Sequence, residues 1–239
     1  MAPLPNSLED AVEQAKGATQ AALQNGLSRI TVELAFPELK VMPLVQQFYP
    51  ILEEMGLQFK LYFPDAGAAA LAKRDWQNPP FTIRGLGEFK GQIEADDEAF
   101  LVIEPSAVEV EAVEALVQEA TGRPVILFNP KLEDIATIGI GYAGRQLRDR
   151  FLSTLETCYY LRPLENAAIS RCYPEPWQVW REQPDGTYTL LAETPQRPAG
   201  EALDQILYDQ ETGEADGPAP KPQKNFLAEL QKFIRALTQ

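Results

Sequence analysis

Residues 99–128 read AFLVIEPSAVEVEAVEALVQEATGRPVILF, and this stretch decides the fold class. The continuous apolar runs at residues 99–104 and 124–128 are typical of strands that are buried on both faces. Between them, Ser106 is a suitable N-terminal cap for a helix that continues to about Thr121. A strand, a crossover helix and a second strand form a β-α-β unit, so we expect the two strands to pair in parallel.

The same alternation extends toward the N-terminus. Strands are predicted at residues 29–36 and 57–63, separated by a helix at 42–55 that Pro50 kinks or breaks. Beyond residue 156 the predicted strands become short and closely spaced, which requires antiparallel pairing. These strands are expected at residues 157–163, 167–173, 177–181 and 187–192.

We therefore predict a layered α/β fold with a mainly parallel sheet built from β-α-β units and extended by an antiparallel C-terminal meander. Residues 1–211 are expected to form a single α/β domain, with the antiparallel part at about residues 156–193. Residues 212–224 are rich in Pro, Gly and polar side chains and predict a linker. Residues 225–239 then close the chain as an amphipathic helix.

The composition restricts the chemistry that the chain can carry out. Its 239 residues have a formal net charge of −14 and include no histidine and two cysteines. Ser-His-Asp and Cys-His catalytic systems and histidine-bearing zinc sites all need an imidazole and are excluded. Two cysteines cannot build a four-thiolate zinc site, and the acidic charge argues against nucleic-acid binding. We expect no cofactor, and carboxylates remain the candidates for any catalysis.

Polar side chains follow the predicted parallel strands, next to a proline in each case. Glu38, Asp65, Glu104 and Asn129 would lie at the carboxyl ends of the strands, where open α/β sheets bind ligands. The carboxylates could hold Mg²⁺, or one of them could act as a base. In the alternative interpretation the prolines only end the strands and Asp65 caps a helix.

A glycine motif precedes a predicted helix in the middle of the chain. Gly139, Gly141 and Gly144 match the G-x-G-x-x-G spacing of dinucleotide-binding loops, although close packing of the glycines explains them equally well. Arg145 and Arg148 follow on one face of the helix. They predict a site for a phosphate, a carboxylate or an acidic partner loop, or a solvated face paired with neighbouring acids.

The central segment is comparatively basic and rich in aromatic residues. Residues 121–180 carry a net charge of +1, against −11 for residues 1–120. Aromatic rings and arginines are enriched at protein interfaces, although half-buried strands would place some of the rings in the core. The residues that we expect to bind a partner are Arg145, Arg148, Tyr159, Arg162, Arg171, Trp177 and Trp180.

Cys158 and Cys172 allow a geometric prediction. If residues 164–166 form a three-residue hairpin loop, the two cysteines lie directly opposite each other and within reach of a disulfide. In a reducing compartment we expect two buried thiols instead.

The predicted C-terminal helix combines an apolar stripe with a local positive charge. It could dock on an anionic membrane surface or in a groove of a partner, or fold back over its own domain. This prediction depends on Phe226, Leu230, Lys232, Phe233, Arg235 and Leu237.

Four stretches of the sequence are distinctive: PDAGAAALAKRDW at 64–76, RPVILFNPKLED at 123–134, GIGYAGRQLRDRFLSTLETCYYLRPLE at 139–165 and RCYPEPWQVW at 171–180. Together they resemble a family of domains of unknown function from cyanobacteria and plastids, whose best-known plant member is named for low photosystem II accumulation. The resemblance extends over about residues 5–208. It offers no catalytic motif that could be transferred to this chain.

The resemblance implies a non-enzymatic auxiliary role in photosystem II assembly, through contacts with photosystem II subunits or other assembly factors. The N-terminal residues MAPLPNSLEDA show no secretory or transit signal, so a cytoplasmic protein is expected, and the resemblance implies that it is peripheral at the thylakoid membrane. The alternative is an α/β enzyme or a protein that binds a nucleotide or phosphometabolite, with Mg²⁺ as a candidate ion. It would use the strand-end carboxylates and the glycine motif.

Overall fold

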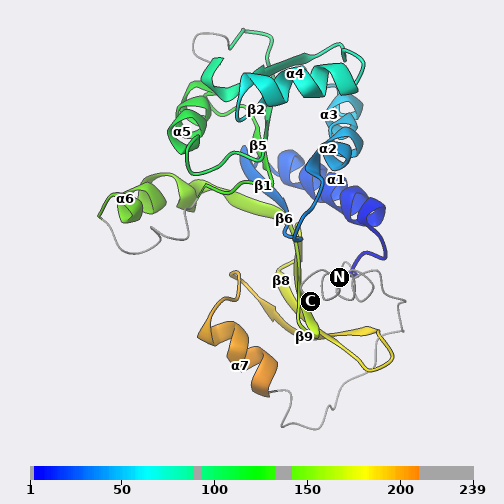
Figure 1. The fold of residues 1–239 in the computed structure, drawn as a ribbon. Coiled ribbons are helices and arrows are strands. Elements are labelled where there is room, and N and C mark those ends of the chain that lie inside the picture. Colours follow the sequence, from blue (N-terminus) through cyan, green and yellow to red (C-terminus); the bar gives the residue numbers. More distant parts are fainter. Residues whose placement is uncertain (1–2, 89–92, 133–141, 210–239) are drawn as a thin grey trace. The chain divides into compact units, whose positions relative to one another are not determined.

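The computed structural model describes residues 3–88, 93–132 and 142–209 (Figure 1). Nine strands form one sheet in the order β3-β2-β4-β5-β1-β6-β7-β8-β9. The first five strands in this order pair in parallel, and β6 to β9 pair with antiparallel register. The predicted mixed α/β fold class is confirmed. The expected linker and the amphipathic helix at 225–239 lie outside the described residues.

The strands begin and end close to their predicted positions. The parallel strands are β1 (Arg29–Leu34), β2 (Phe59–Phe63), β3 (Thr82–Gly85), β4 (Ala99–Ile103) and β5 (Val125–Phe128). The antiparallel strands are β6 (Glu156–Leu164), β7 (Ala167–Cys172), β8 (Trp177–Glu182) and β9 (Tyr188–Thr194).

The described helices are α1 (Leu8–Gln24), α2 (Val41–Phe48), α3 (Pro50–Glu54), α4 (Ala66–Asp75), α5 (Val110–Glu119), α6 (Tyr142–Arg150) and α7 (Glu201–Asp209), with short 3-10 turns η1 (Leu86–Glu88) and η2 (Leu152–Thr154). Pro50 is the first residue of α3 and separates this helix from α2. Proline has no N–H to donate within a continuous helix, but it is suited to the first position of one. Ser7 caps α1, because its Oγ accepts a hydrogen bond from the Asp10 amide at 3.0 Å.

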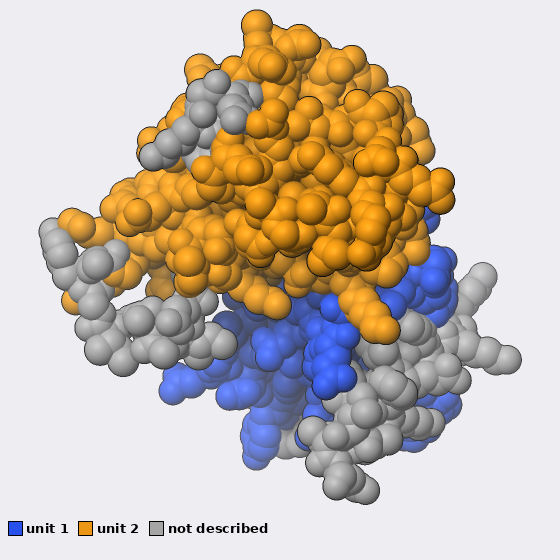
Figure 2. All heavy atoms as spheres, turned by 45° about the horizontal axis from the view of Figure 1, so that its top comes forward, with its two compact units in different colours: residues 1–18, 34–39, 159–239 blue, residues 19–33, 40–158 orange. Residues whose placement is uncertain are grey.

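The chain divides into two compact units (Figure 2). Unit 1 contains residues 1–18, 34–39 and 159–239, and unit 2 contains residues 19–33 and 40–158. Three of the four boundaries fall within α1, β1 and β6, and the fourth lies between β1 and α2. In unit 1, the buried side chains of Tyr160, Ile169 and Trp177 form a core cluster.

Unit 2 has helices on both faces of its parallel strands (Figure 1). On one face Tyr62, Phe100 and other strand residues pack against apolar side chains of α5. On the other face, Phe48 of α2 packs against Phe128 with tilted rings whose centroids are 5.1 Å apart, and the ring centroid of Trp76 lies 6.1 Å from that of Phe63. Each such fully buried side chain contributes about 1.5–3 kcal/mol, which explains the continuous apolar runs.

The hairpin of β6 and β7 corrects the cysteine prediction. Its loop contains two residues, Glu165 and Asn166, because Leu164 pairs with Ala167. Asn166 has a φ of 54°, a left-handed conformation that asparagine tolerates. The register therefore shifts by one position, and Tyr159 rather than Cys158 lies opposite Cys172. Because side chains alternate along a strand, this shift turns the two cysteines toward opposite faces.

We expect mild oxidation of the folded protein to leave both thiols free, because cysteines on opposite faces cannot reach disulfide geometry. Neither cysteine forms a disulfide in the structure, and the Cys158 thiol donates a hydrogen bond to the Thr31 carbonyl at 3.4 Å. Burial, and secondarily the charge of Glu175, raises the pKa of the Cys172 thiol, which slows its reaction at neutral pH. Thiol titration before and after oxidation checks this prediction, and the loss of two thiols per chain would contradict it.

Gly85 ends β3 against the start of α4. A Cβ atom at this position would lie 2.8 Å from the backbone nitrogen of Ala66 and 2.9 Å from the backbone carbon of Asp65. Gly85→Ala should therefore lower the free energy of unfolding by about 1–3 kcal/mol. Gly17→Ala, in the exposed middle of α1 with nothing within 4 Å, should raise it by up to about 1 kcal/mol. Urea denaturation of both variants gives the comparison, and equal stabilities would refute it.

Candidate functional site

Ligand binding was expected at the carboxyl edge of the parallel strands. There, polar side chains that follow the strands interact with other groups of the protein. Glu104 and Asn129 follow the neighbouring strands β4 and β5, and both have a left-handed φ, of 45° and 50°. The two segments then pair again through a bridge between Ser106 and Lys131. The Lys131 ammonium lies 3.6 Å from the Glu104 carboxylate. The left-handed residues Glu104 and Asn129 thus interrupt the two strands only locally, and the parallel pairing resumes after them.

Asp65 is a helix cap, as one of the two interpretations predicted. Its Oδ1 accepts a hydrogen bond from the Ala68 amide at 2.9 Å at the start of α4. It follows β2, which neighbours β4, and the chain leaves these strands toward opposite sides, to β3 and β5. This is a topological switch point, so Asp65 and Glu104 stand where doubly wound sheets bind ligands. Glu38 belongs to unit 1, whereas Asp65, Glu104 and Asn129 belong to unit 2.

The helix after the glycine motif is α6, which begins at Tyr142 and contains Gly144. Gly139 and Gly141 lie outside the described residues. Arg145 and Arg148 are exposed on α6, which fits both a site for an acidic partner and a solvated face.

A bidentate ion pair ties α6 to α5. Arg150 donates from Nε and Nη2 to the two carboxylate oxygens of Glu114, each at 2.9 Å. Leu147 packs against the apolar core of unit 2. The helix is thus held on one side and presents its basic side to solvent.

The aromatic residues of the antiparallel strands lie in the interior. Tyr159, Trp177 and Trp180 are buried, so they are not exposed contact residues as the interface interpretation required. Tyr160 and Trp177 have ring centroids 5.1 Å apart, and the guanidinium of Arg171 lies 5.5 Å from the Trp177 ring. Of the two arginines predicted on these strands, Arg162 is exposed and Arg171 is half-buried. Whether they contact a partner stays a prediction.

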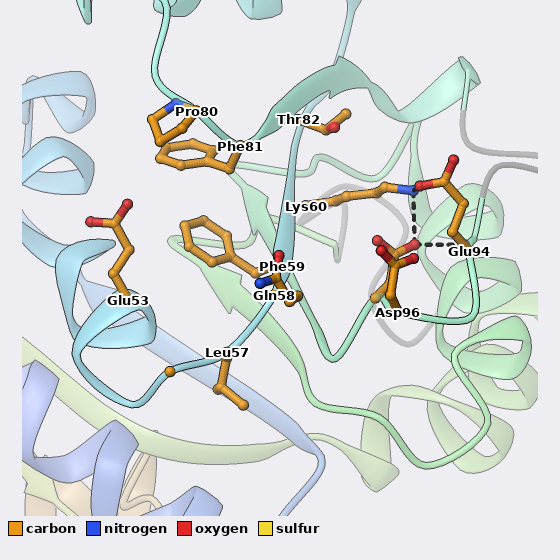
Figure 3. A pocket seen from close by; sticks show the side chains of 12 residues that line it. Glu53, Leu57, Gln58, Phe59, Lys60, Pro80, Phe81, Thr82, Glu94 and Asp96 are labelled. Carbon is orange, nitrogen blue, oxygen red and sulfur yellow. Dashed lines mark hydrogen bonds and ion pairs between the residues drawn. The ribbon is translucent and has the colours of Figure 1, made fainter.

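A pocket that the sequence did not reveal lies at the amino edge of the same parallel strands. It has a volume of about 470 Å³ and is formed by the starts of β2 and β3, the end of α3 and the segment before β4 (Figure 3). We call it the amino-edge pocket; its lining includes Glu53, Phe59, Lys60, Phe81, Thr82, Glu94, Asp96 and Asp97.

A buried ion pair forms the polar side of this pocket. The Lys60 side chain is 8% exposed, and its Nζ lies 2.8 Å from Asp97 Oδ2 and 3.0 Å from Glu94 Oε2. Burial alone would lower the pKa of Lys60, but the hydrogen bonds to Asp97 and Glu94 outweigh it and the pKa is raised. The amine is therefore a fixed cation at neutral pH and not a nucleophile.

The segment that carries the carboxylates is rigidly held. Asp97 Oδ2 accepts a hydrogen bond from the Glu94 amide at 2.7 Å. Arg123, just before β5, donates from Nη1 to the carbonyl oxygens of Glu94 and Asp97, both at 3.0 Å. Its guanidinium also lies 5.4 Å from the centre of the Phe100 ring. The acidic side of the pocket is thus preorganised by contacts with Lys60 of β2 and with Arg123, which precedes β5.

Aromatic rings form the other side of the pocket. Phe59 and Phe81 have centroids 4.6 Å apart, and Tyr49 stands behind Phe81 at 4.8 Å. In Figure 3 these two phenylalanines lie between Glu53 on one side and Lys60 with its carboxylates on the other.

The oxygens of Glu94, Asp96 and Asp97 lie within 4.8 Å of one another, a spacing that could suit a metal ion. The Lys60 ammonium already contacts two of these three carboxylates. Lys60 therefore serves as the counter-ion of this group, and the arrangement alone does not define a metal site.

The fold defines the chain as a mixed α/β protein, with an acidic and aromatic pocket at the amino edge of its parallel strands. It belongs to the family described as Domain of unknown function (DUF1995), which matches residues 5–205. The predicted resemblance is thereby confirmed at the level of a domain of unknown function. Among the described residues, no helix is long and apolar enough to cross a membrane.

Lys60→Met should lower the free energy of unfolding by about 3–5 kcal/mol, because it leaves the buried carboxylate of Asp97 without its cation. The raised pKa of Lys60 means that the pair contributes stability at neutral pH. This contribution is lost only in alkaline solution, as the pH rises through the raised pKa of Lys60.

Lys16→Met is the matched control. Lys16 contacts the exposed carboxylate of Glu13 at 2.6 Å on α1, and its loss should cost less than about 1 kcal/mol. Urea denaturation at pH 7 measures both variants. Equal losses would show that Lys60 is not a buried, paired charge.

Proposed function

We propose that this protein is a non-enzymatic accessory factor that acts by binding other proteins, and that the exposed basic face of α6 is its main contact surface. The observation that carries the proposal is the attachment of α6 to α5 through Arg150 and Glu114, with Arg145 and Arg148 exposed. Guanidinium groups on a fixed helix suit the carboxylates of an acidic partner loop. The positive charge of these arginines contrasts with the net charge of −14 of the whole chain, so the helix is a distinct feature of the surface.

The partner class comes from the family resemblance. The stretch at residues 139–165, which includes α6, resembles the family with the plant protein named for low photosystem II accumulation. We therefore propose photosystem II subunits or their assembly factors as partners, at the thylakoid surface. The basic residues of the tail at 225–239 would add a weak contact with anionic lipid.

Affinity capture from gently solubilised photosynthetic membranes tests this proposal. Arg145→Ala combined with Arg148→Ala should reduce the recovery of photosystem II subunits at least about tenfold, since the loss of even one charged hydrogen bond costs about 1.5–3 kcal/mol. Arg74→Ala, at another exposed arginine on α4, is the control and should leave recovery unchanged. Recovery that is the same for both variants, or that contains no photosystem II protein, would count against the proposal.

A second candidate function is ligand binding at the switch point between β2 and β4, favoured by the position of Asp65 and Glu104. A nucleotide with Mg²⁺ present at 100 times its dissociation constant should stabilise the protein by about 2.7 kcal/mol. Thermal-shift titration with nucleotides and Mg²⁺ measures this effect. The absence of any shift would remove this candidate.

A further inference from the structure

The antiparallel strands of unit 1 have one face on which arginine is the only charged residue. Residues that pair directly across antiparallel strands have their side chains on the same face. The register therefore places Arg162, Arg171 and Arg181 on one face of β6, β7 and β8. The other paired positions of this face, including those of β9, hold uncharged side chains. In a chain with a net charge of −14, this face is locally positive.

Helix α7 lies on this face. Its Leu203 packs against the buried core cluster of unit 1, and the helix also contacts β9 (Figure 1). Arg181 donates a hydrogen bond to the Leu207 carbonyl in the last turn of α7, the end of a helix where a cation is favourable. The face thus already holds an amphipathic helix by an apolar contact and by its C-terminal end. We call this surface the α7 seat; it consists of Tyr160, Arg162, Ile169, Arg171, Trp177 and Arg181.

Two guanidinium groups lie at the aromatic centre of the seat. The guanidinium carbon of Arg171 lies 5.5 Å from the centre of the Trp177 ring. That of Arg197, in the segment between β9 and α7, lies 5.9 Å from the same ring and 4.3 Å from the Tyr160 ring. Cation–π contacts of this length are attractive, so the two rings hold positive charge in the middle of the seat.

The acidic side chains of α7 make no use of this charge. Glu201 and Asp204 are exposed, and neither forms an ion pair with another described residue. Arg162 of the seat is also exposed and forms no ion pair within the described part of the chain. An amphipathic helix with better-placed carboxylates would therefore gain electrostatic attraction that α7 does not have.

α7 is short and only shallowly buried. It has nine residues, and helices of this length are marginal in water without tertiary contacts. Its least exposed residues, Leu203, Ile206 and Leu207, are half-buried, and none of residues 201–208 is fully buried. Few buried apolar contacts are typical of segments that open at a low free-energy cost. A helix that binds the seat more tightly could therefore replace α7.

We propose that the α7 seat binds an acidic amphipathic helix of a partner protein, which takes the place of α7. An apolar side chain of the partner occupies the position of Leu203, its last turn accepts a hydrogen bond from Arg181, and its carboxylates lie against Arg162. The seat belongs to unit 1 and α6 to unit 2, so this second contact surface does not rest on the proposed function of α6.

Hydrogen exchange of the full chain tests whether α7 leaves the seat in the folded protein. The amides of α7 should exchange at least about tenfold faster than those of β7 and β8, because α7 opens without unfolding of the strands. Mass spectrometry of peptic fragments measures both. If α7 exchanges only together with the strands, the seat is never free in the folded protein and the proposal is wrong.

Binding is tested by fluorescence anisotropy with a labelled, blocked peptide that has the sequence of residues 200–209, GEALDQILYD. In the unaltered chain α7 competes with the peptide, so Leu203→Ser, which loosens α7, should strengthen peptide binding about tenfold. Ala202→Ser, at an exposed position of the same helix, is the control and should change binding about twofold at most. Absence of binding to the Leu203→Ser chain, or equal binding to both variants, would overturn the proposal.

A charge-reversed peptide and a charge-reversed surface test the recognition of acids. The same peptide with lysine at its three acidic positions should bind at least about tenfold more weakly, and added salt should weaken only the acidic peptide. In the Leu203→Ser chain, Arg162→Glu should weaken the acidic peptide about tenfold. Arg74→Glu makes the same change of net charge on α4 and should leave binding unchanged. Equal binding of the two peptides, or equal effects of the two arginine variants, would refute the recognition of an acidic helix.

A second copy of the chain is another source of an acidic helix, because its own α7 could occupy the seat. Light scattering over the concentrations of the peptide titration should show a monomer. A dimer that dissociates on Leu203→Ser would mean that the seat serves self-assembly, and the proposal of a partner helix would be wrong.

Discussion

Complete burial of the central parallel strands is the constraint on which the rest of unit 2 depends. All residues of β2, β4 and β5 are buried, and a charge within them has to be paired because its desolvation costs several kcal/mol. Lys60 meets this requirement near the start of β2, where its amino group reaches Asp97 and Glu94. Arg123 then satisfies the carbonyls of the same segment. The buried ammonium of Lys60 thereby fixes the positions of the carboxylates on the acidic side of the pocket.

Most of the fold could be predicted from the sequence because doubly buried strands read as continuous apolar runs. Residues 57–63 and 99–104 were recognised in this way, and Pro50 marked the break between α2 and α3. The hairpin register could not be predicted, because it depends on the loop length. Two residues instead of three place Tyr159 opposite Cys172. Such a shift moves every side chain to the other face.

The pocket was missed for a topological reason. Lys60 and Glu94 are 34 positions apart in the sequence. They meet because β2 pairs with β4 in the sheet, although β3 lies between these two strands in the sequence. Strand order of this kind cannot be derived from the spacing of apolar runs. Two signals were nevertheless present: a lysine within the apolar stretch at residues 57–63 and the acidic run EADDE at residues 94–98. Asp65 follows β2 and Glu104 follows β4, where Asp65 caps a helix, as one of the two interpretations predicted, and Glu104 pairs with Lys131.

The division of the chain has a consequence for synthesis on the ribosome. Unit 1 joins residues 1–18 with residues 159–239, so its first segment must wait while about 140 residues are translated. At 5–20 residues per second this interval lasts roughly 7–28 s. Gln14, whose side-chain oxygen accepts a hydrogen bond from the Tyr159 hydroxyl at 3.2 Å in the finished protein, lacks this partner during that time. Unit 2 is complete once residue 158 has emerged, so its folding can precede the closure of unit 1 around the N-terminus.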